Sequence, residues 1–166
     1  LDVVQCGSGE LILFHDETTA HRTDGSYIVS ETEYSTLKEL HVLDTKENIP
    51  LLRSALEEIP KTVDVQLDLK QHGIASATGQ AVEDYAHDIY VCATETDILQ
   101  EVKNEPWNAD LGFVSFPHFQ YEDIDPKSIS EAEIDDVIHT AVNSGCSFIE
   151  IPQELCIDTS IIQKAQ

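Results

Sequence analysis

Short apolar runs alternate with longer segments that carry apolar residues at helical spacing, and this alternation constrains the fold more than any other feature. The runs expected to form strands are residues 1–5, 10–14, 63–69, 89–93, 111–116 and 146–151. The segments expected to form helices are residues 48–59, 78–87, 94–104, 130–144 and 158–165. Strands that alternate with helices indicate a mostly parallel sheet covered by helices. The sequence therefore predicts an α/β fold.

Two segments depart from a regular alternation. The first two strands are separated by only a few residues around Gly7 and Gly9, whereas a parallel crossover needs a dozen or more. We therefore expect a local hairpin or a distortion of the sheet there. Residues 17–47 are polar and long for a connection, with one short helix expected near residues 33–40. We interpret them as a functional segment or an insertion within a single domain of residues 1–166.

The strand at residues 63–69 begins a stripe of polar side chains. Asp64, Gln66, Asp68 and Lys70 alternate there with apolar residues, so the four share one face of the strand. Strands of a parallel sheet are normally apolar on both faces. The stripe is typical either of a site at the strand ends or of a half-exposed antiparallel strand with one solvated face.

The charge balance excludes some classes of partner. The chain has 32 acidic residues against 9 lysines and arginines, a formal net charge of -23. Nucleic acids and anionic membrane surfaces both require a basic protein surface. We therefore expect neither as a partner. Such an excess fits a protein adapted to a high-salt cytoplasm, where charges are screened, or simply an acidic protein.

The cysteines and the longest apolar run indicate in which cellular compartment the protein is expected. Cys6, Cys92, Cys146 and Cys156 are far apart in the sequence and form no Cys-x-x-Cys pair, so we expect reduced thiols rather than a zinc site. Reduced thiols favour a cytoplasmic location. The longest apolar run, residues 11–14, is far too short for a transmembrane segment.

Four residues at the ends or inner faces of the expected strands could carry chemistry: Asp2, His15, Asp68 and Lys70. In an α/β barrel, side chains at the carboxyl ends of the strands converge on one face. Two carboxylates there suit Mg²⁺ or Ca²⁺, which prefer oxygen ligands. A histidine can transfer protons, and a lysine can stabilise charge on a phosphate. The set favours metal-assisted phosphoryl chemistry over acyl transfer.

The same residues lie in runs that resemble the glycerophosphodiester phosphodiesterase family. The resemblance is most specific from residue 1 to residue 70, and it rests on the runs Leu1–Gln5, Gly9–Thr18, Asp24–Gly25 and Leu67–Lys70. It implies a TIM-type (β/α)8 barrel that hydrolyses glycerophosphodiesters, which are small molecules, to glycerol 3-phosphate and an alcohol. It also implies Asp2 and Asp68 as ligands of Mg²⁺ or Ca²⁺, His15 as one of two acid/base histidines, and Lys70 as the residue that stabilises the phosphate charge.

The chain departs from the family pattern at several points. The family's first strand, with its His-Arg-Gly motif and second acid/base histidine, precedes the match, and so does a metal-binding glutamate just before Leu1. Asp68 stands where the family usually has glutamate, which shortens the reach by one methylene. We expect an incomplete barrel that covers roughly strands 2 to 7, inactive alone and active within a larger protein. The alternatives are a degenerate, non-catalytic barrel used for binding and a lysophospholipase D-type phosphodiesterase.

Overall fold

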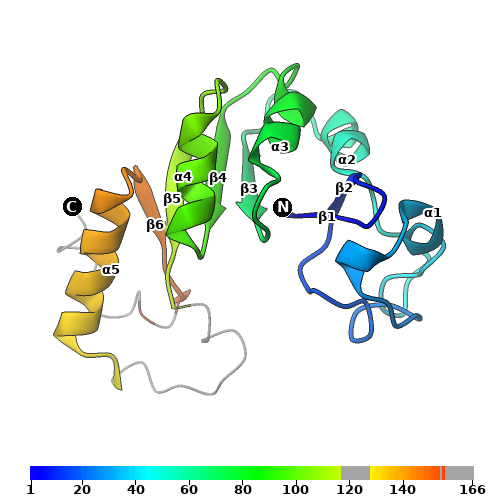
Figure 1. Cartoon of the computed structure of the whole chain (residues 1–166), viewed down its shortest axis with the longest axis horizontal. Coiled ribbons are helices and arrows are strands. Elements are labelled where there is room, and N and C mark those ends of the chain that lie inside the picture. Colours follow the sequence, from blue (N-terminus) through cyan, green and yellow to red (C-terminus); the bar gives the residue numbers. More distant parts are fainter. Residues whose placement is uncertain (117–127, 154, 156–166) are drawn as a thin grey trace.

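A computed structural model of the chain describes residues 1–116, 128–153 and 155, and these residues form one six-stranded sheet with helices (Figure 1). The strand order is β2-β1-β3-β4-β5-β6. The strands are β1 (Asp2–Gln5), β2 (Leu11–Leu13), β3 (Val65–Leu69), β4 (Ile89–Ala93), β5 (Asp110–Val114) and β6 (Phe148–Glu150). The predicted α/β class is therefore correct.

The sheet is parallel except at one edge. β1 pairs with β2 in the antiparallel direction, whereas β3, β4, β5 and β6 continue from β1 in parallel. The connection between β1 and β2 is a tight turn in which Gly9 has a φ of 95°, a conformation that favours glycine. The expected hairpin is confirmed, and it explains why so short a loop can join two neighbouring strands.

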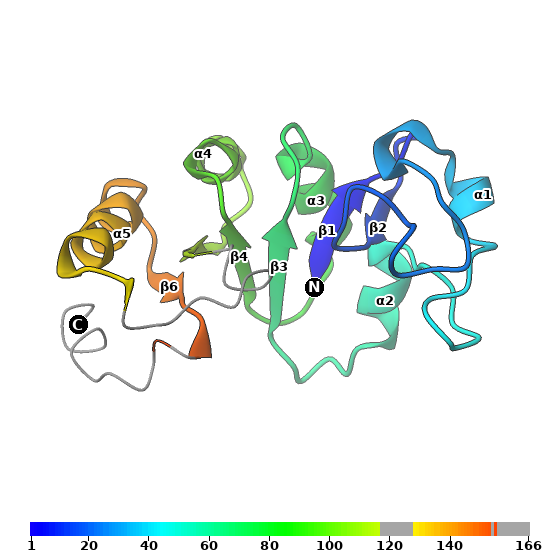
Figure 2. The ribbon, with the colours of Figure 1, turned by 90° about the horizontal axis from the view of Figure 1, so that it is seen from below.

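Helices cover one face of the sheet, as Figure 2 shows for α3, α4 and α5. The larger helices are α2 (Leu52–Glu58), α3 (Ala75–Val82), α4 (Thr96–Asn104) and α5 (Glu131–Asn143). The main core joins α2, α3 and α4 to the sheet through fully buried residues such as Leu67, Ile98 and Leu99. The apolar side chains of the strand at 63–69 therefore point to the helices, and its polar stripe faces the other way.

The other face of the sheet corresponds to the inside of a barrel. Tyr90 and Phe148 pack edge to face there, with ring centres 5.9 Å apart. Gly112 lies beneath the Phe148 ring, which a β-carbon at that position would overlap. Within the described residues the sheet runs from β2 to β6 without closing, as expected for an incomplete TIM-type barrel.

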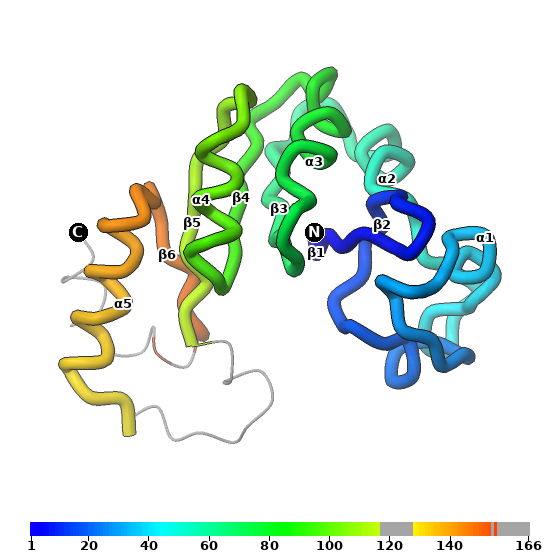
Figure 3. The backbone as a smooth tube through the Cα atoms, viewed as in Figure 1, coloured from blue at the N-terminus to red at the C-terminus, as the bar shows by residue number. Residues whose placement is uncertain are grey.

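The polar segment 17–47 has a small core of its own. It contains the 3-10 helix η1 (Val29–Glu31), which the sequence does not predict, and the expected short helix α1 (Tyr34–Leu37). Buried Val29, Leu37 and Leu40 pack with apolar residues of the hairpin, among them Ile12. The segment therefore lies beside β1 and β2, as the tube in Figure 3 shows.

Two expected helices differ most in their bounds from those observed, and one lies outside the described residues. The helix expected from residue 48 begins only at Leu52, because Pro50 accepts a hydrogen bond from Leu13 and Leu51 forms a bridge with Ile12. Residues 49–51 thus extend the hairpin edge. The helix expected at residues 78–87 is α3, which begins and ends earlier. The helix expected at residues 158–165 is in the part that the structure does not describe.

Candidate active site

The parallel pairing of β1 with β3 brings together three of the four predicted site residues. Asp2 is directly opposite Asp68 in the register of the two strands, and Lys70 follows one residue after the end of β3. The Lys70 Nζ is 3.2 Å from Asp2 Oδ1 and donates a hydrogen bond to Asp68 Oδ2. The polar stripe therefore ends in an ammonium group between two carboxylates. β3 pairs in parallel on both sides, so the alternative of an antiparallel solvated strand is wrong.

Burial governs the electrostatics of this cluster. The side chains of Asp68 and Lys70 are only 14% and 16% exposed. Burial raises the pKa of the Asp68 carboxyl; Lys70 opposes this rise, and the charges of Asp2 and Glu150 add to it. Burial alone would lower the pKa of Lys70, but the two aspartates outweigh it and the pKa is raised. The lysine therefore stays charged, and Asp68 takes up a proton more readily than an exposed aspartate.

The contact with Lys70 involves only one of the two carboxylate oxygens of Asp68. Asp68 Oδ1 is buried and has no hydrogen-bond partner among the described residues. A buried acceptor without a partner is costly and marks a position where a further donor or a cation fits. In the part of the chain that the structure describes, no three His, Cys, Asp or Glu side chains are grouped as a metal site. The described residues thus offer two carboxylates with an open oxygen, and not a complete set of metal ligands.

His15 reaches the same region from the hairpin. It comes shortly after β2, and its Nδ1 is 2.6 Å from Asp16 Oδ1. A cavity of about 330 Å³ has both His15 and Lys70 in its lining, together with Asp16 and Gln71. The structure therefore brings all four predicted residues into one region: Lys70 contacts both aspartates and shares a cavity with His15.

The polar segment 17–47 forms another wall of this cavity. Glu17, Ile28, Val29 and Ser30 line it. Ile28 is 47% exposed although it is a large apolar residue. The segment is therefore part of the candidate site, which favours the functional interpretation over that of an unrelated insertion.

Sequence reasoning missed one carboxylate on the inner face of the sheet. Glu150 in β6 accepts a 2.7 Å hydrogen bond from Gln66 Nε2, and the Cys92 thiol lies 3.2 Å from the same nitrogen. Burial raises the pKa of Cys92 to about 12, with further contributions from Asp68 and Glu150, so the thiol stays protonated. Glu150 could have been found by the rule that singled out Asp68, because it ends a parallel strand.

Three of the four cysteines lie in the described residues. Cys6, Cys92 and Cys146 are free, and the first two are buried. Cys156 lies outside the described residues. None of the helices in the described ranges is long and apolar enough to cross a membrane.

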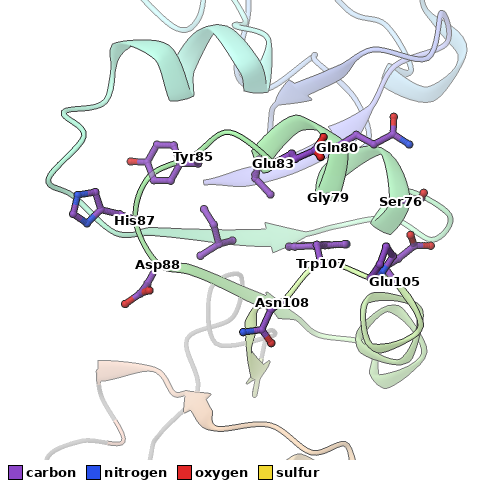
Figure 4. A pocket seen from close by; sticks show the side chains of 13 residues that line it. Ser76, Gly79, Gln80, Glu83, Tyr85, His87, Asp88, Glu105, Trp107 and Asn108 are labelled. Carbon is purple, nitrogen blue, oxygen red and sulfur yellow. The ribbon is translucent and has the colours of Figure 1, made fainter.

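A larger cavity, of about 530 Å³, lies elsewhere and contains none of the predicted site residues. Figure 4 shows its lining, which includes Gly79 and Glu83 of α3 and its neighbourhood, Asp88 before β4, and Trp107 before β5. It therefore lies at the amino ends of β4 and β5. In α/β barrels the chemistry belongs to the carboxyl ends of the strands, so the smaller cavity is the candidate site.

Comparison with solved structures finds the same fold in glycerophosphodiester phosphodiesterases. A putative glycerophosphoryl diester phosphodiesterase from Agrobacterium tumefaciens superposes with a TM-score of 0.76 at 12% identity, over 99% of this chain and 67% of that one. A glycerophosphodiester phosphodiesterase from Thermotoga maritima gives a TM-score of 0.70 at 16% identity, over 99% and 68% of the two chains.

A third structure was solved with a ligand. An Oleispira antarctica phosphodiesterase, in complex with the product sn-glycerol-3-phosphate, gives a TM-score of 0.66 at 18% identity, over 98% of this chain and 83% of that one. No protein-family model matches the sequence, and no curated protein matches it. At these identities the likeness concerns the fold, which is that of the glycerophosphodiester phosphodiesterases.

Proposed function

We propose, from a fold shared with glycerophosphodiester phosphodiesterases, that this chain carries an active-site region for hydrolysis of glycerophosphodiesters to glycerol 3-phosphate and an alcohol. One observation carries the proposal: Lys70, held between Asp2 of β1 and Asp68 near the carboxyl end of β3, lines the same cavity as His15. A lysine, two carboxylates and a histidine are suited to binding a phosphate and moving a proton beside it.

The residues take distinct roles in the proposed reaction. The glycerol hydroxyl next to the phosphate attacks phosphorus, the bond to the alcohol breaks, and water then opens the cyclic ester. His15 exchanges a proton with the attacking hydroxyl or the departing oxygen. Lys70 offsets the negative charge that builds on the phosphate oxygens, since its raised pKa keeps it protonated at neutral pH.

We also propose that Asp2 and Asp68 hold Mg²⁺ or Ca²⁺. The buried, unpartnered Asp68 Oδ1 supports this, because it needs a positively charged or hydrogen-donating neighbour. A set of two carboxylates is enough for Mg²⁺, which commonly keeps several waters and binds one or two carboxylates together with substrate phosphate. When bound, the cation would supply positive charge for the phosphate and the glycerol hydroxyls.

The proposal is tested by binding and by turnover. Binding of sn-glycerol 3-phosphate to the 166-residue chain is measured by calorimetry with and without Mg²⁺ or Ca²⁺. Hydrolysis of glycerophosphocholine is measured on the longest natural protein that contains the chain. We expect cation-dependent binding that Asp68→Asn weakens by roughly tenfold or more, and turnover that His15→Gln reduces by roughly 100-fold or more.

His139→Gln, an exposed position on α5, serves as the matched histidine control and should leave both measurements unchanged. Absence of both binding and turnover would refute the proposed function. Binding without turnover in the longest protein would instead favour the non-catalytic alternative.

A further inference from the structure

His15, Asp16 and Arg22 form a continuous chain of charged hydrogen bonds that leads away from the cavity. His15 Nδ1 is 2.6 Å from Asp16 Oδ1, and Arg22 Nε donates to Asp16 Oδ2 over 2.7 Å. We infer that Asp16 and Arg22 are positioning residues that fix the tautomer and the orientation of His15. The inference rests on the proposed function for its catalytic meaning, although the geometry stands without it.

The carboxylate determines which ring nitrogen carries the proton. An ionised aspartate can only accept hydrogen bonds, so a neutral His15 must place its proton on Nδ1 to satisfy Asp16. Nε2 is then the nitrogen that exchanges a proton with a substrate. Fixing a ring in this way removes rotational freedom that the reaction would otherwise have to lose.

Arg22 keeps Asp16 in the form that the mechanism needs. Burial works to raise the pKa of Asp16, but the hydrogen bonds from His15 and Arg22 outweigh it and lower the pKa. The two oxygens of Asp16 have different partners, one each, so the carboxylate cannot rotate without breaking a bond. Arg22 therefore acts on the histidine through the aspartate.

The polar segment 17–47 holds Arg22 in place by its backbone. The Arg22 amide donates to Thr19, and the Arg22 carbonyl accepts a 2.7 Å bond from Leu43, whose φ is 51°. Thr19 is fully buried, and its hydroxyl donates to the Gly25 carbonyl and accepts from the Tyr27 amide. The fold thus retains strain at Leu43 in an arrangement that anchors Arg22.

The His15 tautomer can be read directly by long-range ¹⁵N–¹H correlation spectra of the labelled chain, with the signal assigned by its loss in His15→Gln. We expect the neutral ring to carry its proton on Nδ1 in the wild-type chain. Asp16→Asn should move the proton largely to Nε2, because the amide can donate to Nδ1. Arg22→Gln should give a mixture of the two neutral tautomers, and Arg22→Lys should restore part of the preference for the proton on Nδ1.

Arg53→Gln is the matched control, because Arg53 is an exposed arginine on α2 whose guanidinium donates a long hydrogen bond, of 3.4 Å, to the Gln80 carbonyl. It should leave the tautomer unchanged. A wild-type ring protonated on Nε2, or a ratio that Asp16→Asn does not alter, would overturn the inference. These readouts need no turnover, so a failure of the proposed hydrolysis is distinguished from a failure of the positioning role.

Where the longest natural protein hydrolyses glycerophosphocholine, the same variants separate positioning from binding. Arg22→Gln should lower kcat by roughly ten- to 100-fold with little change in KM, since Arg22 is not among the described residues that line the cavity. The pH profile of kcat should shift with it. An unchanged profile with a raised KM would assign Arg22 to substrate binding and overturn the positioning role.

Discussion

At the scale of single residues, Lys70 allows two acidic side chains to face each other at the end of a buried strand. Asp2 and Asp68 are opposite each other in the register, and Glu150 adds a third negative charge to the field at Asp68. Like charges held out of water repel strongly. The ammonium group offsets this repulsion through direct contact with both aspartates.

Removal of that ammonium group should destabilise the fold. Lys70→Met keeps most of the side-chain volume but leaves Asp68 buried without a counter-charge, and we expect a loss of roughly 3 kcal/mol in the free energy of unfolding at pH 7. The loss should shrink near pH 4, close to the ordinary aspartate pKa of about 3.9, because a protonated Asp68 needs no counter-charge. Urea unfolding at both pH values measures it.

Lys46→Met removes an exposed lysine from the polar segment and is the control, with an expected change near zero. An equal loss at pH 7 and pH 4 would mean that Lys70 contributes through packing and not through charge.

The strand period of two was enough to predict the polar stripe, and the carboxyl-end rule was enough to choose Asp68 and Lys70 from it. The carboxyl-end rule could also have singled out Glu150, but neither rule predicts its contact with Gln66, which is 84 residues away and is brought close only by the order of the strands in the sheet. The link from Asp16 to Arg22 was also out of reach, since it depends on the path of an irregular segment. Local periodicity predicts which face a side chain takes, and not which distant residue it meets.

At the scale of elements, His72 joins the loop after β3 to α4. Its two ring nitrogens are 3.0 Å from Glu101 Oε1 and 3.1 Å from Glu95 Oε2. Glu101 also accepts a 2.7 Å bond from the backbone amide of Gly73. The loop that carries Lys70 is thus fixed to the neighbouring helix.

This contact should make stability depend on pH. The hydrogen bonds to Glu101 and Glu95 raise the pKa of His72 above 6.5. A raised folded-state pKa stabilises the fold below the unfolded pKa, and this contribution is lost as the pH rises through the folded value. We therefore expect the melting temperature to fall on the alkaline side of pH 6.5, and to fall less in His72→Gln. His139→Gln should follow the wild-type curve; identical curves for all three proteins would contradict the prediction.

The packing of α3 depends on a glycine. Gly79 lies against the indole of Trp107, and a β-carbon there would overlap the ring. Gly79→Ala should therefore cost about 1–3 kcal/mol by overpacking, partly offset by about 1 kcal/mol of helix propensity. Trp107 is the single tryptophan of the chain, so its fluorescence reports unfolding and the displaced ring together. Gln80→Ala, at the exposed neighbouring position, should be near neutral, and equal stability of both variants would exclude the clash.

Whether a segment is a helix or a strand was predictable where its apolar residues follow a clear period. The residues at which an element begins and ends were not predictable where pairing with a distant segment competes with the local preference. The apolar residues 49–51 suit either a helix or the edge of a sheet. They form the edge because they pair with the backbone of β2. The hairpin was predictable only in part: the short loop excludes a parallel crossover, but it does not distinguish a hairpin from a local distortion of the sheet.

At the scale of the whole molecule, the chain carries a large excess of negative charge. With 32 acidic residues and 9 lysines and arginines, most carboxylates have no basic partner to pair with. The excess opposes a compact fold by self-repulsion. The α/β class was predictable from the alternation of strands and helices and the incomplete barrel from the family resemblance, whereas the cavity between the hairpin and the polar segment required the folded chain.

Added salt should therefore stabilise this protein. At about 1 M salt the Debye length shrinks to roughly 3 Å, which screens the many repulsions more than the few attractions. We expect the melting temperature to rise steadily from about 0.05 M to about 2 M KCl, by roughly 2–4 °C for each kcal/mol gained. Differential scanning calorimetry measures the curve, and an equal series in sucrose, which strengthens burial without screening charge, is the control. A melting temperature that rises in sucrose and stays flat in KCl would mean that self-repulsion does not limit the stability of this fold.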